Sequence, residues 1–223
     1  MIGLRILQRQ RAVSLDLARQ FLDIPVANVS DCMARMSAAG PKLRPMHKGG
    51  TLVGPAFTVK TRPGDNLMIH KALELAAPGD VIVVDGGGDL TNSLFGEIMS
   101  HQAEVKGLAG IVIYGAIRDA GILRQSSFPV FAAGVTHRGP YKDGPGEINV
   151  AIAIDGMVIE PGDLILGDED GLLCVPFDQV EALYAAARAK MPLEAKMMTD
   201  ISAGTHDTAW VNATLKRIGC PLE

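Results

Sequence analysis

The chain has 223 residues, of which 48% are apolar and 21% charged, and a formal net charge of −4. A single domain of this size can bury roughly 70% of its unfolded surface, so a large core is available. The negative charge and the lack of a basic patch argue against nucleic acid as the principal partner.

The cysteines Cys32, Cys174 and Cys220 lie far apart and show no CxxC pairing, which predicts neither a zinc site nor a disulfide framework. The apolar part of the N-terminal segment is too short for a signal peptide, and nowhere do about 18 apolar residues follow one another. We therefore expect a cytoplasmic protein with no membrane partner.

The first part of the chain predicts helices ahead of the main sheet. Residues 13–22 carry apolar side chains at helical spacing. Ser30 or Asp31 can cap a second short helix over CMARMSAAG, which Gly40 and Pro41 would close.

The next phrases predict a strand, a turn and a helix. GTLVGPAFTVKT alternates and is rich in β-branched residues, which favours a strand. Residues 63–66, Pro-Gly-Asp-Asn, are typical of a turn, and LMIHKALELA should follow as a helix over 67–76.

The second half is richer in strands. Pro-Gly-Asp occurs at 78–80 and at 161–163, each time as a predicted turn before an apolar run, VIVVD or LILGD. GIVIYG and FPVFAAG predict further strands. Residues 177–191 predict a helix, Pro192 should break it, and a shorter helix should run to Gly204. The pattern is mixed α and β, and no linker forces a domain boundary.

The segment from Val81 to Gly121 is the most informative, because it predicts a strand, a glycine-rich loop, a helix, a second strand and a loop. The helix is expected to begin near Thr91 or Asn92 and to end at Gly107. Its expected apolar stripe consists of Leu94, Ile98 and Val105.

A right-handed strand-helix-strand unit makes the two strands parallel, so the loops after them open on the same edge of the sheet. Gly96 and Glu97 can then approach Arg118 and Asp119, although twenty residues separate Glu97 from Arg118. Small ligands tend to bind in such crevices.

These groups have coherent chemistry. Backbone N–H groups at a helix start and the planar fork of Arg118 can hold one carboxylate together. Asp119 offers a hard oxygen ligand for Mg²⁺ or Mn²⁺, and Glu97 could orient a metal-bound water. A 2-oxo acid could chelate that metal, which would hold the charge of an enolate as a carbon–carbon bond breaks.

Plainer interpretations stand beside this one. An Arg-Asp pair at the end of a strand is by itself more often a surface ion pair. His101, one turn after Glu97, fits a helix surface, and Asp168 with Asp170 fits a strand-connecting turn better than a calcium loop. The sequence contains no GxGxxG, HExxH or GxSxG motif.

GEIMSHQAEVKGLAGIVIYGAIRD has an acidic residue, twenty positions and then Arg-Asp. In this it resembles the class II pyruvate aldolases that cleave 4-hydroxy-4-methyl-2-oxoglutarate and 4-carboxy-4-hydroxy-2-oxoadipate, in the superfamily of the regulator of ribonuclease E activity A. The resemblance extends to VSDCM, GPAFTV, GDN at 64–66, PGDVIVVDGGG, FPVFAAG and PGDLILGDEDGLLCVP, and covers most of residues 25–190.

The resemblance implies an α/β fold, a β/β/α swivelling-domain-like (RraA-like) sandwich with flanking N- and C-terminal helices. It implies one RraA-like aldolase domain over 1–223, with a C-terminal helical extension from about 177. It also implies a homo-oligomer, either a trimer or a hexamer built as a dimer of trimers, with the site at a subunit boundary.

Carried over by position, Arg118 would bind the pyruvyl carboxylate, Asp119 would hold Mg²⁺, and Glu97 would position the catalytic water. Position 97 departs from the family, since the aldolases carry aspartate there. A carboxylate from the neighbouring subunit is also implied, for which Glu194 is the candidate. The backbone N–H groups that would line the substrate are those of Gly96, Glu97, Ile98 and Met99.

The function implied is metal-dependent aldol cleavage of 4-hydroxy-2-oxo diacids to pyruvate and a second oxo acid, with oxaloacetate decarboxylation through the same enolate. The alternative is a regulator that binds and inhibits ribonuclease E without catalysis. Asp119 and the tail after Arg188 favour the enzyme. The distal half of the substrate has possible contacts in Arg62, Lys71, His137 and Arg138, unless these are solvated surface charges.

Overall fold

The structure is a computed structural model that describes residues 1–36 and 39–221. Four parallel strands form its centre, in the order β3-β4-β6-β7. Their bounds are Leu52–Thr61 (β3), Val81–Asp85 (β4), Gly110–Ile117 (β6) and Val130–Val135 (β7). These runs of Val and Ile are buried on both faces, as expected of a parallel sheet that is covered on both sides.

Shorter strands extend this sheet. β8 (Gly146–Ile148) pairs antiparallel with β3, β1 (Leu4–Ile6) runs parallel to β8, and β2 (Arg44–Pro45) pairs with β7. β11 (Leu164–Asp168) lies antiparallel to both β3 and β12 (Gly171–Val175).

The sheet has a helical face and a second β face. On the helical face, α3 (Leu67–Leu75) and α4 (Glu97–Val105) pack on Ile82 and Val84 of β4. The neighbouring side chains of β4, Val81 and Val83, point to the other face, where the hairpin of β9 (Ile152–Ile154) and β10 (Met157–Ile159) covers them. Because successive side chains of β4 point to opposite faces of the sheet, this strand contributes to two separate hydrophobic cores.

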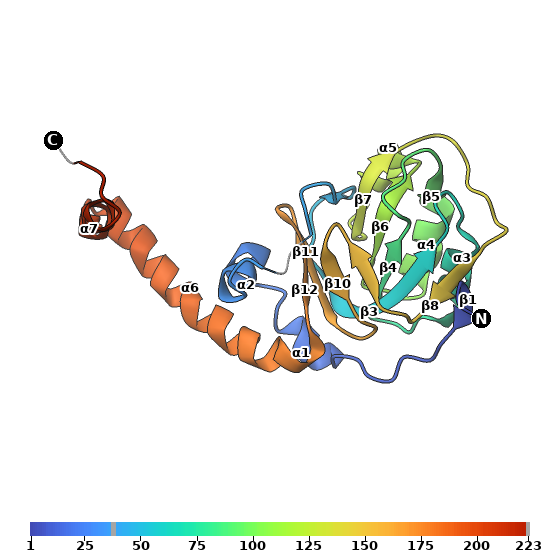
Figure 1. Cartoon of the computed structure of the whole chain (residues 1–223), viewed down its shortest axis with the longest axis horizontal. Coiled ribbons are helices and arrows are strands. Elements are labelled where there is room, and N and C mark those ends of the chain that lie inside the picture. The colour runs from blue at the N-terminus through green and yellow to red at the C-terminus, as the bar shows by residue number, and fades with distance from the viewer. Residues whose placement is uncertain (37–38, 222–223) are drawn as a thin grey trace.

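A third core lies between β11, β12 and the terminal helices. There α1 (Leu15–Arg19), α2 (Val26–Cys32) and the first turns of α6 (Val180–Ser202) bury Phe21 and Ala187. Beyond those turns α6 leaves the body of the molecule and carries α7 (Ala209–Arg217) at its far end (Figure 1). The predicted α/β fold with flanking N- and C-terminal helices is confirmed.

Both predicted Pro-Gly-Asp turns are present in the structure. In each of them the aspartate side chain accepts a backbone hydrogen bond. The Asp80 carboxylate accepts the N–H of Ala77 at 2.8 Å, and the Asp163 carboxylate accepts that of Glu160 at 2.9 Å. Arg9 reaches the first of these carboxylates, with 2.7 Å between its Nη1 and the Asp80 Oδ1.

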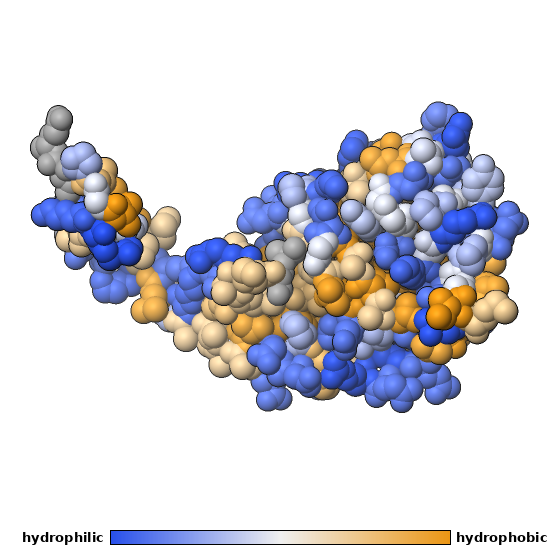
Figure 2. All heavy atoms as spheres, viewed as in Figure 1, coloured by the Kyte–Doolittle hydropathy of each residue, from blue (hydrophilic) through white to orange (hydrophobic). Residues whose placement is uncertain are grey.

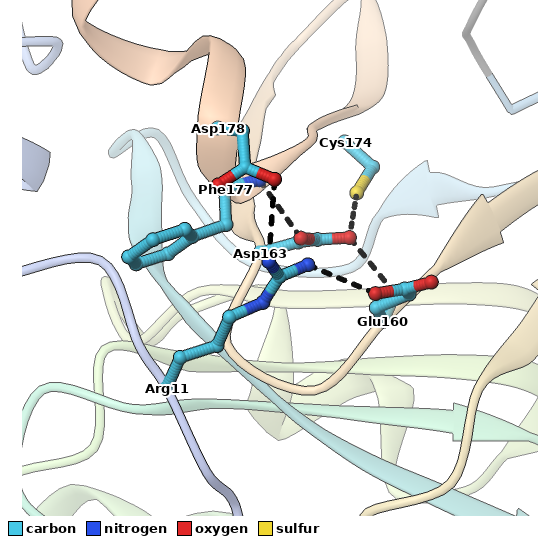
Figure 3. A network of polar contacts seen from close by, with 6 residues as sticks. All are labelled: Arg11, Glu160, Asp163, Cys174, Phe177 and Asp178. Carbon is cyan, nitrogen blue, oxygen red and sulfur yellow. Dashed lines mark hydrogen bonds and ion pairs between the residues drawn. The ribbon is translucent and has the colours of Figure 1, made fainter.

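A polar network beside the second turn ties the N-terminal segment to the short 3-10 helix η1 (Phe177–Gln179), which leads into α6 (Figure 3). Arg11 pairs with Glu160 at 2.9 Å and with Asp178 at 3.3 Å. Cys174 lies in the same network, with its Sγ 3.7 Å from Asp163 Oδ2. Burial, followed by the charge of Asp163, raises the pKa of the Cys174 thiol well above its ordinary value, so this thiol stays protonated.

The predicted second helix was misplaced. α2 ends at Cys32, where that helix was expected to begin, and Ser30 lies inside α2. The positive φ values of Ala34 (54°) and Arg35 (62°) end the helical path. The helix starts earlier because the Asp168 carboxylate accepts the N–H of Val26 at 2.9 Å, which satisfies a free donor of the first turn. The last part of CMARMSAAG includes residues 37–38, which lie outside the described residues.

The start of the helix in the central segment was predicted wrongly too. This helix, α4, begins at Glu97, later than predicted. Residues 93–95 form β5 (Ser93–Phe95), which pairs with the end of β6, so Leu94 is a buried strand residue. In α4 the predicted stripe is wrong, since Ile98 is 79% exposed and Val105 74% exposed. The buried face is Met99, Ser100 and Ala103.

Pro192 does not break the C-terminal helix. α6 continues through it to Ser202 as one element. Proline removes one backbone hydrogen bond from a helix, at a cost of about 3 kcal/mol. The alanine, leucine, glutamate and lysine residues on both sides favour helix strongly enough for the path to continue. Among the described residues, no helix combines the length and apolar character needed to cross a bilayer.

Candidate active site

The parallel pairing of β4 and β6 brings the two expected loops to one edge of the sheet. β5 strengthens this approach, because Phe95 lies beside Ile117 and the Phe95 carbonyl accepts the N–H of Arg118 at 2.9 Å. The residue after Phe95 is Gly96, the N-cap of α4. Backbone hydrogen bonds therefore place the start of α4 beside the Arg-Asp pair.

The carboxylate of Asp119, a residue in the loop after β6, lies next to the first residue of α4. Its Oδ2 accepts the Glu97 N–H at 3.0 Å and lies 3.6 Å from the Arg118 Nε. The residue has a left-handed backbone, with φ of 58°, a conformation that aspartate tolerates better than most residues. The positive end of a helix dipole favours a negative charge at this place.

Gly96 lies so close to Arg118 and Asp119 that no space is left for a side chain at this position. A Cβ added there would lie 2.5 Å from Asp119 Oδ2 and 3.0 Å from Arg118 Cγ. The φ of Gly96 is −161°, which any residue can adopt, so its backbone conformation imposes no need for glycine. A side chain at position 96 would displace the charged pair.

A cavity of about 400 Å³ opens at this edge of the sheet. Five residues of the predicted site line it, whereas Glu97, which is exposed, is not among the lining residues. The lining residues predicted from the sequence are Gly96, Ile98, Met99, Arg118 and Asp119.

The lining also includes Asn66, His70 and Lys142, which sequence reasoning missed as site residues. Asn66 is only 3% exposed and donates through Nδ2 to the Leu94 carbonyl at 3.1 Å. Burial, and then the charge of Lys142, lowers the pKa of His70 below its ordinary value, so the ring is neutral near pH 7. The phrase GDN at 64–66 was the available signal, but its pattern indicates a turn and a family resemblance rather than a buried side chain in a cavity wall.

Glu194 does not line the cavity of its own chain. It lies on α6, on the opposite side of the molecule from α4 (Figure 1). Its carboxylate accepts from Asn28 Nδ2 at 2.7 Å and lies 3.3 Å from the Lys190 Nζ. Its role at a neighbouring subunit stays a prediction.

The candidate contacts for the distal half of a substrate, Arg62, Lys71, His137 and Arg138, also lie outside the lining of this cavity. Arg62 pairs with Asp65 at 3.2 Å, and Lys71 pairs with Glu74 at 2.6 Å.

Two plainer interpretations agree with the structure. His101 is exposed on α4, and the Asp168 carboxylate accepts the Asp170 N–H at 2.9 Å within the β11–β12 turn.

The described part of the chain contains no group of three or more His, Cys, Asp or Glu side chains that could enclose a metal ion. At the cavity, Asp119 is the acidic lining residue, and its carboxylate is about one-third exposed. This donor set fits a cation that keeps most of its water ligands, such as Mg²⁺.

Comparison with known proteins defines the family. The family model described as RraA-like, Aldolase/RraA, matches residues 26–174. The chain is 40% identical over 176 residues to a protein of Halalkalibacterium halodurans whose name proposes 4-hydroxy-4-methyl-2-oxoglutarate aldolase activity. That match covers 79% of this chain and 84% of the relative.

Two further matches come from Thermus thermophilus. A 4-hydroxy-4-methyl-2-oxoglutarate aldolase is 40% identical over 112 residues, covering 50% of this chain and 68% of that protein. The structure of the RNA-processing inhibitor RraA matches with a TM-score of 0.64 and 32% identity, covering 69% of this chain and 93% of that one. The chain belongs to the RraA-like family, and its relatives in sequence support an aldolase, a carbon–carbon lyase, as the class of protein.

Proposed function

We propose that this chain cleaves 4-hydroxy-2-oxo diacids to pyruvate and a second oxo acid. The observation that carries the proposal is the meeting of Arg118, Asp119 and the first turn of α4 at one cavity of ligand size. The names of the related aldolases agree with it.

The pocket is suited to a carboxylate of the substrate. The Arg118 side chain is 45% exposed, and its contact with Asp119 involves Nε, so both terminal nitrogens can face a ligand. Ile98 and Met99 stand in the first turn of α4, where the N–H groups have no acceptor within the helix. Arg118 and these amides would orient the pyruvyl end.

A divalent cation, Mg²⁺ or Mn²⁺, is part of the proposal. Asp119 would hold it, water would complete its shell, and Glu97 would orient one of those waters from the rim. When bound, the cation supplies a Lewis acid that stabilises the negative charge of a pyruvate enolate. Oxaloacetate decarboxylation passes through the same enolate, so we propose it as a second activity.

We further propose that the working unit is a homo-oligomer, a trimer or a hexamer, in which α6 and α7 pack on a neighbouring copy. The outer half of α6 and α7 carry apolar side chains that face solvent in one chain, among polar ones (Figure 2). These exposed residues include Leu193, Met198, Ile201, Trp210 and Ile218. Burial against a second copy would remove this surface from water and could carry Glu194 toward the neighbour's cavity.

The experiment is to incubate the purified protein with Mg²⁺ or Mn²⁺ and either oxaloacetate or 4-hydroxy-4-methyl-2-oxoglutarate, and to couple pyruvate to lactate dehydrogenase. We expect NADH consumption that chelation of the metal abolishes. The absence of pyruvate with every substrate and metal would overturn the proposal.

The similarity to RraA keeps a second candidate, a protein that inhibits a ribonuclease by contact. The aspartate after Arg118 favours the lyase. A pull-down of ribonuclease E, together with an RNA-cleavage assay, tests the regulator directly. Inhibition of the ribonuclease by a protein that forms no pyruvate would decide for it.

A further inference from the structure

Two polar atoms in the wall of the cavity lack partners. Among the described residues, Asn66 Oδ1 and His70 Nε2 are buried and make no hydrogen bond. Asn66 is the N-cap of α3, and His70 lies one turn later, with its N–H donating to the Asn66 carbonyl at 3.2 Å. Residues four apart share one face of a helix, so the two side chains are neighbours.

The orientation of the Asn66 amide is fixed. Its Nδ2 donates to the Leu94 carbonyl at 3.1 Å and lies 3.6 Å from the Met99 Sδ. The Oδ1 is therefore an acceptor without a donor. An unpaired buried acceptor is costly, and native proteins rarely retain one without a partner such as a ligand or water.

Asn66 and His70 both line the cavity, so access to the two buried atoms depends on the side chains next to them. The side chains beside them are flexible: Met99 lies next to Asn66, and the charge of Lys142 acts on His70. Both of these residues line the same cavity. A ligand group that displaced them would meet one acceptor and one imidazole nitrogen.

We propose that Asn66 and His70 form a subsite for the C4 hydroxyl of the bound substrate, in which Asn66 Oδ1 accepts a hydrogen bond from the hydroxyl and His70 Nε2–H donates one to the hydroxyl oxygen. This inference rests on the proposed function, because it names the groups that would bind one part of that substrate. A neutral ring is required for one nitrogen to donate without adding a charge, and the lowered pKa of His70 agrees with that state.

The subsite would make the cavity selective for substrates that carry a C4 hydroxyl. A 4-hydroxy-2-oxo diacid satisfies both atoms, whereas the C4 group of oxaloacetate is a carboxylate, which can accept from His70 but has no proton for the Asn66 Oδ1. Sites built to bond a hydroxyl discriminate strongly against ligands that lack it. Asn66 and His70 would therefore be specificity-determining residues, separate from the groups that hold the pyruvyl end.

The test compares two ligands that differ only in this hydroxyl and that cannot undergo aldol cleavage, 2,4-dihydroxyglutarate and 2-hydroxyglutarate. Calorimetry with Mg²⁺-loaded protein measures both affinities. The wild type should prefer the dihydroxy ligand by about tenfold, the ratio that one net hydrogen bond of typical strength supplies.

Variants show which residues cause the preference for the dihydroxy ligand. His70→Leu should remove most of it, and His70→Gln, which keeps an N–H donor, should restore part of it. His101→Leu, on the exposed face of α4, is the matched control and should keep the wild-type ratio. Asn66→Ser, checked for folding by thermal unfolding, tests the acceptor independently.

The outcomes separate this inference from the proposed function. A wild type that forms pyruvate but binds both ligands equally, or neither of them, overturns the subsite alone. The subsite also fails if His70→Leu and Asn66→Ser both keep the preference. A wild type that forms no pyruvate but prefers the dihydroxy ligand overturns the lyase and supports the subsite.

Discussion

The N–H of Glu97 donates to the Oδ2 of Asp119 at 3.0 Å, so the first turn of α4 and the loop after β6 share one carboxylate. This bond fixes Asp119 relative to the cavity. It also means that the charge of Asp119 and its hydrogen-bonding capacity can be tested separately.

Asp119→Asn keeps an oxygen for the Glu97 N–H and removes the charge. We expect pyruvate formation to fall about a hundredfold or more, the usual effect of losing a group that stabilises developing charge. Steady-state rates at saturating metal measure it. Glu104→Gln, an exposed change on the same helix, should stay active. Wild-type turnover in Asp119→Asn would contradict the assigned role.

Arg118→Lys keeps the positive charge and removes the planar fork. Since a lysine ammonium cannot bind a carboxylate in bidentate fashion, we expect kcat/KM for pyruvate formation to fall at least about tenfold. Arg124→Lys, at the exposed end of α5 (Ala120–Leu123), is the matched control. If Arg118→Lys matched the wild type, a point charge would suffice.

Gly96→Ala tests the close approach at the start of α4. The new methyl would lie 2.5 Å from Asp119 Oδ2, so the carboxylate must move and activity should fall sharply. Gly121→Ala, where the structure places nothing within 4 Å of the added Cβ, should be tolerated. Thermal unfolding and pyruvate assays on both variants make the comparison. Equal activity of the two would show that the contact is not needed.

Acid sensitivity should involve the bond between the N-terminal strand and β8. The hydrogen bond from Arg5, and then that from the Gly3 N–H, lowers the pKa of Glu147 below its ordinary value. A depressed carboxyl pKa contributes stability above the unfolded value of about 4.3, and this stability is lost as pH falls through the folded value. Glu147→Gln should therefore lower the unfolding temperature at pH 7, and this effect should become smaller as the pH falls below the unfolded value. A pH-independent effect would exclude this linkage.

The oligomer can be tested through Glu194, which would serve a neighbour's cavity. Glu194→Gln should lower turnover about tenfold if this carboxylate assists catalysis. Glu181→Gln, exposed near the start of α6, is the control. Mixing Glu194→Gln with the separately inactive Asp119→Asn should recover part of the activity, because mixed assemblies contain sites with both native residues. No recovery from re-assembled mixtures would place both groups in one subunit or remove Glu194 from the site.

The central sheet could be predicted because its strands are long apolar runs bounded by turns. VIVVD and GIVIYG are short β-branched runs bounded by turn residues, which favours buried strands, and their parallel pairing placed Arg118 beside the loop after β4. The start of α4 could not be predicted, since Ser93–Phe95 has no strong pattern and becomes a strand only by pairing with the end of β6. A tertiary contact thus decided between helix and strand.

Several residues of the cavity lining, among them Asn66 and His70, could not be predicted from the sequence as site residues. Asn66 looked like a turn residue and His70 like one polar position in a helix. Their chemistry depends on burial and on missing partners, and neither property can be seen until the chain is folded. Helix α6 shows a different limit, since local rules placed a break at Pro192 and the flanking helix-forming residues outweighed it.

The hydrogen bond between the Arg118 N–H and the Phe95 carbonyl makes the floor of the cavity part of the sheet. Local opening of the backbone at this point would require β5 to separate from β6. The amide proton of residue 118 should therefore exchange with solvent more slowly than the amide protons of the exposed loops.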